Sequence, residues 1–326
     1  MKFQDIKLGI APINWCNDDM PELGKDISTN QCLDDMKASD YSGTEMGHRF
    51  SSDPVLLKNQ LDSCQLELAS AWHSTFFADR NRHKEQMDSL KQKLEFLKKM
   101  NAVCINLAEC TRSIHGNIEC PLIHKPELSD KEWNALISGL THASHLCLEY
   151  GIKPAYHHHM GTVIQSEEEI RFLLEETKHD GPGLCLDTGH LKYAGADSMP
   201  LLSTYFHRIH HIHFKDLRQG IFDKLQYQES FLNAVLQGVF TVPGDGMIDF
   251  DPVVKALVKN QYKGWIIVEA EQDPKQAPPL EYARKASAYL NELFSRYTRK
   301  SIGENLRYRL SYLTLDNDLF YKDLII

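Results

Sequence analysis

Short apolar runs that end in histidine or carboxylate side chains recur along this chain, and they limit its fold more than any other feature. The clearest four are Tyr156–His159, Leu186–His190, His211–Asp216 and Val268–Glu271. Polar groups delivered from the ends of several strands are typical of a β/α barrel, which carries its active site at the carboxyl-terminal rim. Imidazole and carboxylate groups are also ligands of divalent metals. The pattern therefore predicts a metal site at one rim of a barrel.

The whole chain repeats the order of a β-type run followed by a helix-type segment. Eight runs are predicted as strands: Lys7–Asn14, Gly43–Gly47, Glu67–His73, Val103–Glu109, Lys153–His159, Gly183–Asp187, Ile209–Lys215 and Trp265–Glu271. Two helix starts have capping-box spacing, Ser129 with Glu132 and Ser166 with Glu169, and Gly151 is placed to end the first of these helices. Eight alternations without an interior linker predict a single (β/α)8 TIM barrel, an α/β fold.

The predicted barrel domain spans residues 1–297, because the last apolar helical stripe ends near Tyr297. Residues 298–326 are predicted as a C-terminal extension, to which the sequence assigns no role. The 42% hydrophobic content fits a globular protein with a substantial core. No leader-like start and no apolar run of spanning length are found, so we expect a cytoplasmic protein without a membrane partner.

Cysteine usage and charge narrow the functional class. The eight cysteines form no CxxC pair, which suits a reducing compartment. The formal net charge of −9, without a dense basic patch, argues against a nucleic acid as partner.

Strand geometry groups the candidate residues. Side chains alternate faces along a strand, so we expect His157 and His159 to face one way and His158 the other. The same alternation predicts two further one-face sets, which are His211 with His213 and Lys215, and Glu269 with Glu271. Neighbouring carboxylates repel unless a cation neutralises them or one keeps a proton, and both outcomes suit acid–base catalysis. A surface histidine cluster or a structural ion-pair network is the alternative interpretation.

Asp187 directly follows three apolar residues and would be costly to bury unless it meets a cation or a donor. A helix N-cap is the structural alternative, although capping alone does not require His190 three residues later. Polar or aromatic side chains end the earlier strands as well: Asn14, Trp15, Glu45, His73 and Glu109.

Several long stretches resemble a known family. They are Gly9–Met20, Tyr156–Thr162, Leu186–Leu191, Val239–Gly246 and Val268–Pro274. With the predicted barrel, they resemble the xylose-isomerase-like metal enzymes and, within them, the inosose dehydratases, from about residue 7 to residue 297. The segment after Tyr297 departs from the usual end of that family.

The resemblance implies a set of site residues around a divalent metal. Metal ligands would be Asp187, His213 and Glu269, with Glu271 as the reserve for Glu269, and either His157 or a water where many relatives carry a glutamate. The candidate bases would be the pair Glu269 and Glu271, or Glu45. The candidate acids would be His157, His190 and Lys215. Substrate contacts would be Asn14, Trp15, His73, Glu109, His159 and Asp245. Mixed ligation suits Mn²⁺ or Co²⁺ and allows Zn²⁺; whether a thiol such as glutathione takes part stays open.

The implied reaction removes water from 2-keto-myo-inositol (scyllo-inosose) and yields a trihydroxycyclohexanedione. A divalent cation polarises the carbonyl, a base removes the neighbouring proton, and an acid protonates the departing hydroxyl. The expected partner is thus a small polyol ketone, and assembly into a homo-oligomer stays open. Three alternatives remain: a sugar isomerase or epimerase on the same barrel, an enzyme acting on abasic DNA, and a polyol-binding protein without turnover.

Overall fold

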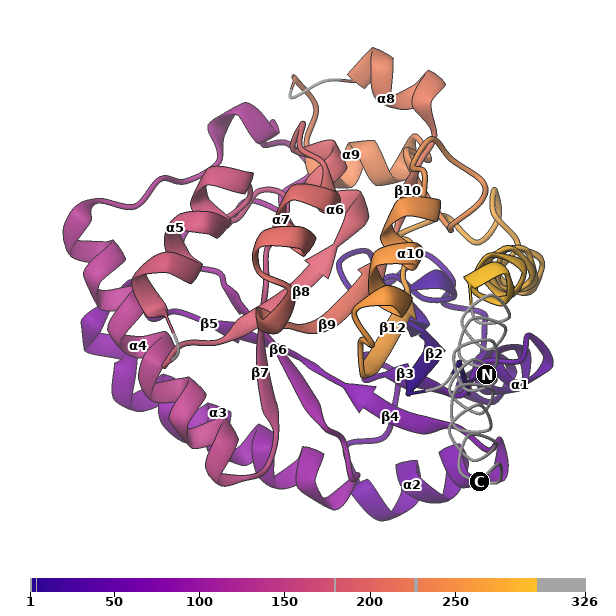
Figure 1. Cartoon of the computed structure of the whole chain (residues 1–326), viewed down its shortest axis with the longest axis horizontal. Helices are drawn as coiled ribbons and strands as arrows, with labels where there is room; N and C mark the ends of the chain where they lie inside the picture. The colour runs from indigo at the N-terminus through magenta and orange to yellow at the C-terminus, as the bar shows by residue number, and fades with distance from the viewer. Residues whose placement is uncertain (1, 4, 179, 226–227, 298–326) are drawn as a thin grey trace, which may run out of the picture.

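The computed structural model describes residues 2–3, 5–178, 180–225 and 228–297, and it confirms the predicted TIM barrel (Figure 1). The parallel strands are β2 (Ile6–Ile10), β3 (Gly43–Glu45), β4 (Glu67–Ser70), β5 (Trp72–Thr75), β6 (Cys104–Glu109), β7 (Lys153–His157), β8 (Gly183–Asp187), β9 (Ile209–Phe214) and β12 (Gly264–Val268). They pair in the order β4-β3-β2-β12-β9-β8-β7-β6-β5. Only Ala71 separates β4 from β5, so this one run pairs with β3 on one side and β6 on the other and closes the barrel.

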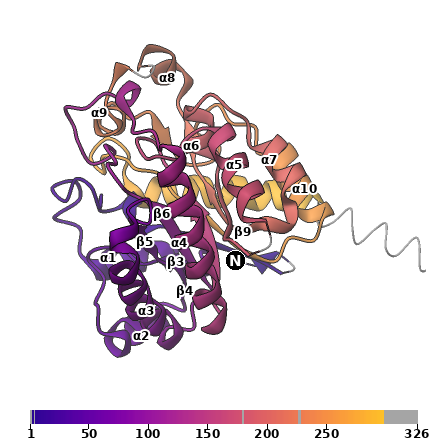
Figure 2. The same cartoon turned by 90° about the vertical axis from the view of Figure 1, so that its left-hand side faces the viewer.

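Helices cover the outside of this barrel, as the two views at right angles show (Figures 1 and 2). They are α1 (Thr29–Ala38), α2 (Pro54–Ser63), α3 (His83–Lys99), α4 (Asp130–Glu149), α5 (Glu167–Thr177), α6 (Thr188–Tyr193), α7 (Ser198–Thr204), α10 (Asp251–Lys259) and residues 279–297. Short 3-10 turns lie at Pro12–Asn14, Arg80–Arg82, Leu122–His124 and Phe206–Arg208.

The predicted helix signals are confirmed. Glu169 N donates to Ser166 Oγ at 3.3 Å, and Ser166 N donates back to Glu169 Oε2 at 2.9 Å, which completes the capping box of α5. The box at Ser129 starts α4. Gly151, with a φ of 74°, follows the last turn of α4 and lets the chain leave the helix toward β7.

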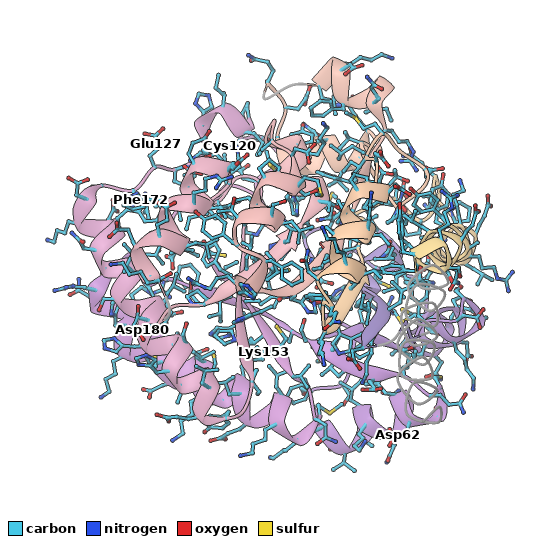
Figure 3. All side chains as sticks on the ribbon, viewed as in Figure 1. Asp62, Cys120, Glu127, Lys153, Phe172 and Asp180 are labelled. Atoms are coloured by element: carbon cyan, nitrogen blue, oxygen red, sulfur yellow. The ribbon has the colours of Figure 1, made fainter. Side chains whose placement is uncertain are left out.

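Small residues leave room for a large one inside the barrel. A Cβ on Gly43 would lie 2.4 Å from the Trp265 ring, and a Cβ on Gly9 would lie 2.7 Å from Ile267. Trp265 and Ile267 pack there with Ala11 and form an apolar layer inside the sheet. A larger cluster fills the space between the strands and the helices, where side chains occupy the gaps between ribbons (Figure 3). The barrel interior is thus a packed core that supports one open end.

An extension that the sequence did not predict covers one side of that end. Its elements are β10 (Asp216–Leu217), α8 (Gln219–Leu225), α9 (Phe231–Leu236) and β11 (Phe240–Thr241), and β10 pairs with β11 antiparallel. At the N-terminus, β1 (Lys2–Phe3) pairs antiparallel with β2. Phe231 of the extension lies against the ring of His159, with ring centroids 4.8 Å apart, and Phe240 lies 5.7 Å from His190. These aromatic rings shield that side of the site from water.

No helix within the described ranges has both the length and the apolar character that crossing a membrane requires. The predicted extension at residues 298–326 lies outside the described residues.

Candidate active site

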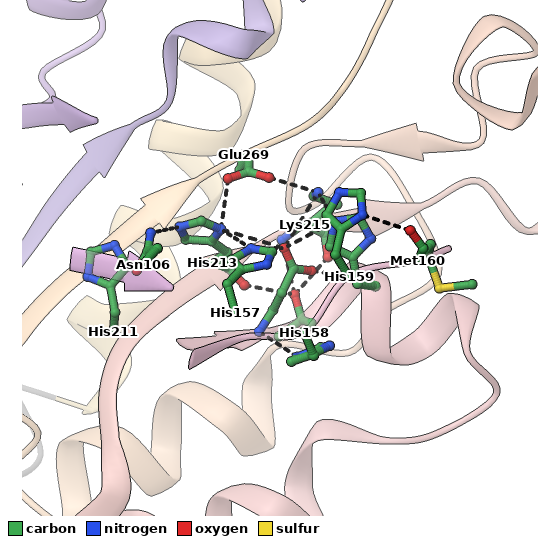
Figure 4. A network of polar contacts seen from close by, with 12 residues as sticks. Asn106, His157, His158, His159, Met160, His211, His213, Lys215 and Glu269 are labelled. Atoms are coloured by element: carbon green, nitrogen blue, oxygen red, sulfur yellow. Dashed lines mark hydrogen bonds and ion pairs between the residues drawn. The ribbon is translucent and has the colours of Figure 1, made fainter. Parts of the chain in front are cut away.

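Four side chains from four neighbouring strands converge at the carboxyl end of the barrel (Figure 4). His213 Nδ1 lies 2.7 Å from Glu269 Oε2, 3.0 Å from His157 Nε2 and 3.6 Å from Asp187 Oδ2. The sequence placed these residues at the ends of separate strands, and parallel pairing brings them to one point. Ligand atoms bound to one metal at about 2.1 Å lie roughly 3 Å apart. The distances from His213 Nδ1 to the other three donor atoms are close to this spacing, so the four residues could hold one metal ion.

Asp187 shows most directly that the site fits a cation. Its Oδ1 accepts from His190 N at 2.8 Å and begins α6, but its buried Oδ2 has no hydrogen-bond partner among the described residues. The nearest donors to Oδ2 are Lys215 Nζ at 3.5 Å, His213 Nδ1 at 3.6 Å and His157 Nε2 at 3.7 Å. These distances are too long for hydrogen bonds. A buried carboxylate oxygen left in this way fits a bound divalent metal.

Lys215 is the main counter-charge of the site. Its ammonium is fully buried, 2.8 Å from Glu269 Oε1 and 2.7 Å from Glu271 Oε1. Burial alone would lower the pKa of Lys215, but Asp187, Glu269 and Glu271 outweigh burial and raise it. Lys215 therefore stays charged and allows the two glutamates of one face to lie side by side.

The buried charges of the site do not cancel. Burial would raise the pKa values of the four site carboxylates, but cationic neighbours outweigh it, so the pKa of each lies below its ordinary value. The main neighbour is His213 for Glu45 and Glu269, and Lys215 for Asp187 and Glu271. The pKa of His213 is raised above its ordinary value, because Cys185, Glu269 and Glu45 outweigh burial. In the metal-free site, four carboxylates against the two cations Lys215 and His213 leave a net negative charge, and His213 must lose its proton to bind a metal, so the site is suited to a divalent cation.

Glu45 orients the His213 ring. Its Oε1 faces His213 Nε2 at 3.1 Å and His211 Nε2 at 2.8 Å, and it accepts from Asn106 Nδ2 at 2.9 Å. Ser70 Oγ donates to the same oxygen. A carboxylate on Nε2 leaves Nδ1 of the same imidazole directed at Asp187 and Glu269, as in the carboxylate–histidine–metal arrangement of many metal sites.

A cavity of about 230 Å³ opens onto this cluster. Six of the residues singled out in the sequence line it: Glu45, His157, His159, His213, Glu269 and Glu271. The predicted alternation is confirmed, because His158 points away from the cavity and its Nε2 accepts from Asp187 N at 3.3 Å. His159 Nδ1 is bonded to Met160 O at 2.9 Å, and its Nε2 lies 3.9 Å from Glu271 Oε1.

Two candidate acids lie behind the cavity wall and do not line it. Lys215 Nζ and His190 Nε2 are 2.9 Å apart, and both reach Glu271 Oε1 from the buried side. Burial, followed by the charges of His159 and Lys215, lowers the pKa of His190 to about 4. The expectation that either group gives its proton directly to a substrate is therefore corrected, because both contact Glu271 and neither lines the cavity.

His73 and Glu109 do not line the cavity, which corrects their expected substrate contact. A register shift between β3 and β4 pairs Glu45 with Ser70, so a bulge at Ala69 moves the later residues of this run to the opposite face. Burial and nearby Lys93 of α3 lower the pKa of His73 to about 4. Glu109 accepts from Thr75 Oγ1 and Phe77 N, both at 2.9 Å, and holds the loop after β5.

Three further substrate contacts expected from the sequence are also corrected. Trp15 is fully buried outside the barrel, where its Nε1 donates to Asp35 Oδ2 at 2.9 Å. Asn14 Nδ2 donates to Ala11 O at 2.8 Å and ties the β2 loop. Asp245 accepts from Thr241 Oγ1 at 2.7 Å and pairs with Lys285 and Arg218. None of the three lines the cavity.

Other cavity residues were missed by sequence reasoning. They include Trp72, Ser74, Asn106, Asp19 and His115. The bulge explains why Trp72 and Ser74 were missed, because it turns their side chains toward the cavity in place of the alternate residues of the same strand. Asn106 could have been found, because it is a polar residue inside the apolar run of β6. Asp19 and His115 lie in loops, where the sequence has no periodic pattern from which the direction of a side chain could be predicted.

Comparison with known proteins gives a consistent set of relatives. The sequence model of the xylose isomerase-like TIM barrel family matches residues 33–293. An inosose dehydratase of Geobacillus thermodenitrificans is 45% identical over 293 residues, which cover 89% of this chain and 98% of the relative. An inosose dehydratase of Lacticaseibacillus casei is 45% identical over 288 residues, 88% of this chain and 96% of the relative.

Solved structures share the fold at low sequence identity. The IOLI protein, whose crystal structure holds a zinc atom, has a TM-score of 0.66 at 16% identity and covers 89% of this chain and 99% of its own. An L-ribulose 3-epimerase has a TM-score of 0.66 at 14% identity, with 91% and 97% covered.

Proposed function

Because this chain belongs to the inosose dehydratase family of xylose isomerase-like TIM barrels, we propose that it removes water from 2-keto-myo-inositol (scyllo-inosose) and yields 3D-trihydroxycyclohexane-1,2-dione. The reaction makes it a hydro-lyase. One observation carries the proposal: donor atoms of His157, Asp187 and Glu269 lie within 3.6 Å of His213 Nδ1, beside a cavity that Glu271 and His159 also line.

The proposed metal ligands are His157, Asp187, His213 and Glu269. A divalent metal held there would polarise the substrate carbonyl and so acidify the neighbouring C–H group. Mixed imidazole and carboxylate donors favour Mn²⁺ or Co²⁺, and Zn²⁺ fits the same donor types.

The proposed proton carriers are Glu271 and His159, which lie side by side on the cavity wall. Glu271 is ionised, and its buried Oε2 has no hydrogen-bond partner within the described ranges, so this oxygen is free to take the proton beside the carbonyl. The departing β-hydroxyl needs a proton to leave as water, and His159 would supply it. Lys215 and His190 hold Glu271 Oε1 from behind and fix the direction of Oε2. Both are positioning residues.

We further propose a cytoplasmic location, which the eight free thiols of the chain support. The small polyol ketone is the proposed partner, and assembly into a homo-oligomer stays a prediction.

The decisive experiment combines metal analysis of the purified protein with an assay on scyllo-inosose that follows dione absorbance. We expect stoichiometric divalent metal and dione formation in the wild type. Asp187→Ala or His213→Ala should lose both metal and activity and keep the far-ultraviolet dichroism of the wild type. The exposed Asp62→Ala variant is the control. Conversion of the substrate without a dione would indicate an isomerase or epimerase, and full activity in metal-free variants would refute the metal assignment.

A further inference from the structure

Asp19 and His115 are among the cavity residues that have no part in the proposed metal shell or in proton transfer. Asp19 comes from the loop after β2 and His115 from the loop after β6, and both line the cavity. Asp19 Oδ1 and His115 Nε2 face each other at 3.8 Å, and the two side chains are 29% and 22% exposed. This distance is too long for a hydrogen bond.

The hydrogen bonds of His115 determine which of its nitrogens carries the proton. Ser113 Oγ contacts both His115 Nδ1 and Gly161 O, and it lies 3.2 Å from the carbonyl oxygen. A carbonyl can only accept, so the single hydroxyl proton of Ser113 goes to Gly161 O. The assignment that makes both contacts hydrogen bonds has His115 Nδ1–H donating to Ser113 Oγ, and it leaves Nε2 of the neutral ring as an acceptor.

The neutral state of His115 has a physical cause. Burial, followed by the charges of His159 and His190, lowers the pKa of His115 to about 3. Asp19 offers only acceptor atoms when it is ionised, and burial raises its pKa. When Asp19 is ionised, two acceptors face each other across a gap that opens to the cavity, and this arrangement becomes favourable when donors enter it.

The position of the pair is fixed by its surroundings. Asn17 Oδ1 accepts from Asp19 N at 2.9 Å and from Met20 N at 2.8 Å, which holds the turn that carries Asp19. The His115 ring lies against that of His159, with centroids 5.3 Å apart. A group bound between Asp19 and His115 therefore has a defined place relative to the proposed proton donor.

We propose that Asp19 and His115 form a hydroxyl-binding subsite that accepts hydrogen bonds from ring hydroxyls of a cyclic polyol ketone and thereby selects the substrate. The inference rests on the proposed function and adds its specificity-determining residues. A vicinal diol can donate one hydrogen to each acceptor, whereas a ketone oxygen or an ether has none to donate. The subsite therefore distinguishes fully hydroxylated rings from deoxygenated ones.

The test measures KM and kcat for scyllo-inosose and for its analogues that each lack one ring hydroxyl. For Asp19→Ala we expect KM for scyllo-inosose to rise about tenfold, the effect of one lost hydrogen bond, with kcat within about twofold of the wild type. For one deoxy analogue, the wild type should show the same rise in KM and the variant no further rise. Asp26→Ala, which removes an exposed carboxylate from the same segment, is the control.

An unchanged KM in Asp19→Ala would overturn the subsite. It would also be overturned if, for every deoxy analogue, the rise in KM for the variant equalled the product of the rise caused by Asp19→Ala and the rise caused by the missing hydroxyl. Calorimetric titration with myo-inositol separates this result from failure of the proposed function, because it requires no turnover. If the wild type does not dehydrate scyllo-inosose, the proposed function fails. About tenfold weaker binding of myo-inositol by Asp19→Ala than by Asp26→Ala would still support the subsite, and equal binding would overturn it.

Discussion

Among single residues, Lys215 has the largest electrostatic role. Its buried ammonium contacts Glu269 and Glu271 and lies 3.5 Å from Asp187. Lys215→Met keeps a linear side chain but leaves three buried carboxylates without this cation. We expect a loss of about 3–5 kcal/mol in the free energy of unfolding, the range found when one partner of a buried ion pair is removed. Chemical denaturation at neutral pH, with a chelator present, measures the loss.

The pH dependence of this loss has a definite sign. In the wild type, the lowered pKa values of Asp187 and Glu271 contribute stability that is present above their unfolded-state pKa values and is lost as the pH falls through the folded-state values. Without Lys215, burial raises these pKa values, so Lys215→Met should instead gain stability as the pH falls. The exposed Lys131→Met is the control. A variant as stable as the wild type at neutral pH would contradict the assignment.

Glu45 tests whether the orientation of His213 matters for metal binding. Glu45→Gln keeps the shape of the side chain but removes the charge that accepts from His213 and His211. We expect metal affinity to fall about 10- to 100-fold, as for other second partners of metal-binding histidines, while the dichroism spectrum stays unchanged. Competition with a fluorescent chelator measures the affinity. Glu67→Gln, which removes a carboxylate whose side chain is 58% exposed, should bind metal like the wild type; equal affinities for both variants would contradict the role of Glu45.

Among the elements, the strands were predictable and one register was not. All eight predicted runs contain strands, because the local sequence of a β-type run bounded by turn residues is enough to predict a strand. The irregular pairing of Glu45 with Ser70 is set by the neighbouring strand, which no local pattern describes. Because of this shift, Trp72 lines the cavity and His73, which was expected there, does not. The proposed metal ligands were found because the second irregularity, between β8 and β9 at Leu184/Cys185, lies before Asp187 and His213, and the pairing after it is regular.

Gly151 offers a test of one helix end. Its φ is 74°, and a Cβ added there would meet nothing within 4 Å, so Gly151→Ala introduces conformational strain without a clash. We expect a loss of about 1 kcal/mol in the free energy of unfolding and unchanged kcat, measured by denaturation and by the dione assay. Gly116→Ala is the matched control, because the site is equally open and lacks a positive φ. Equal losses in the two variants would show that strain at Gly151 is not the cause.

On the scale of the whole molecule, the barrel boundary predicted near Tyr297 can be tested by truncation. The relatives match this chain over 98% of their own length and only 89% of its length. Tyr297 contacts Asp251 and joins the last described helix to α10. We expect a chain that ends at Tyr297 to fold with the midpoint temperature of the full chain and to keep its kcat. Calorimetry and the dione assay check this, and an insoluble or inactive truncated chain would place the boundary later.

We expect the net negative charge of the buried carboxylates beneath the cavity to make the stability of the fold depend on the proposed divalent metal. A cation that binds the folded chain and not the unfolded one adds RT ln(1 + [M]/Kd) to the free energy of unfolding. Each tenfold increase in free ion above Kd then adds about 1.4 kcal/mol. Scarcity of the ion would therefore both silence the enzyme and shorten the lifetime of the polypeptide, so that its abundance follows the availability of the element it needs.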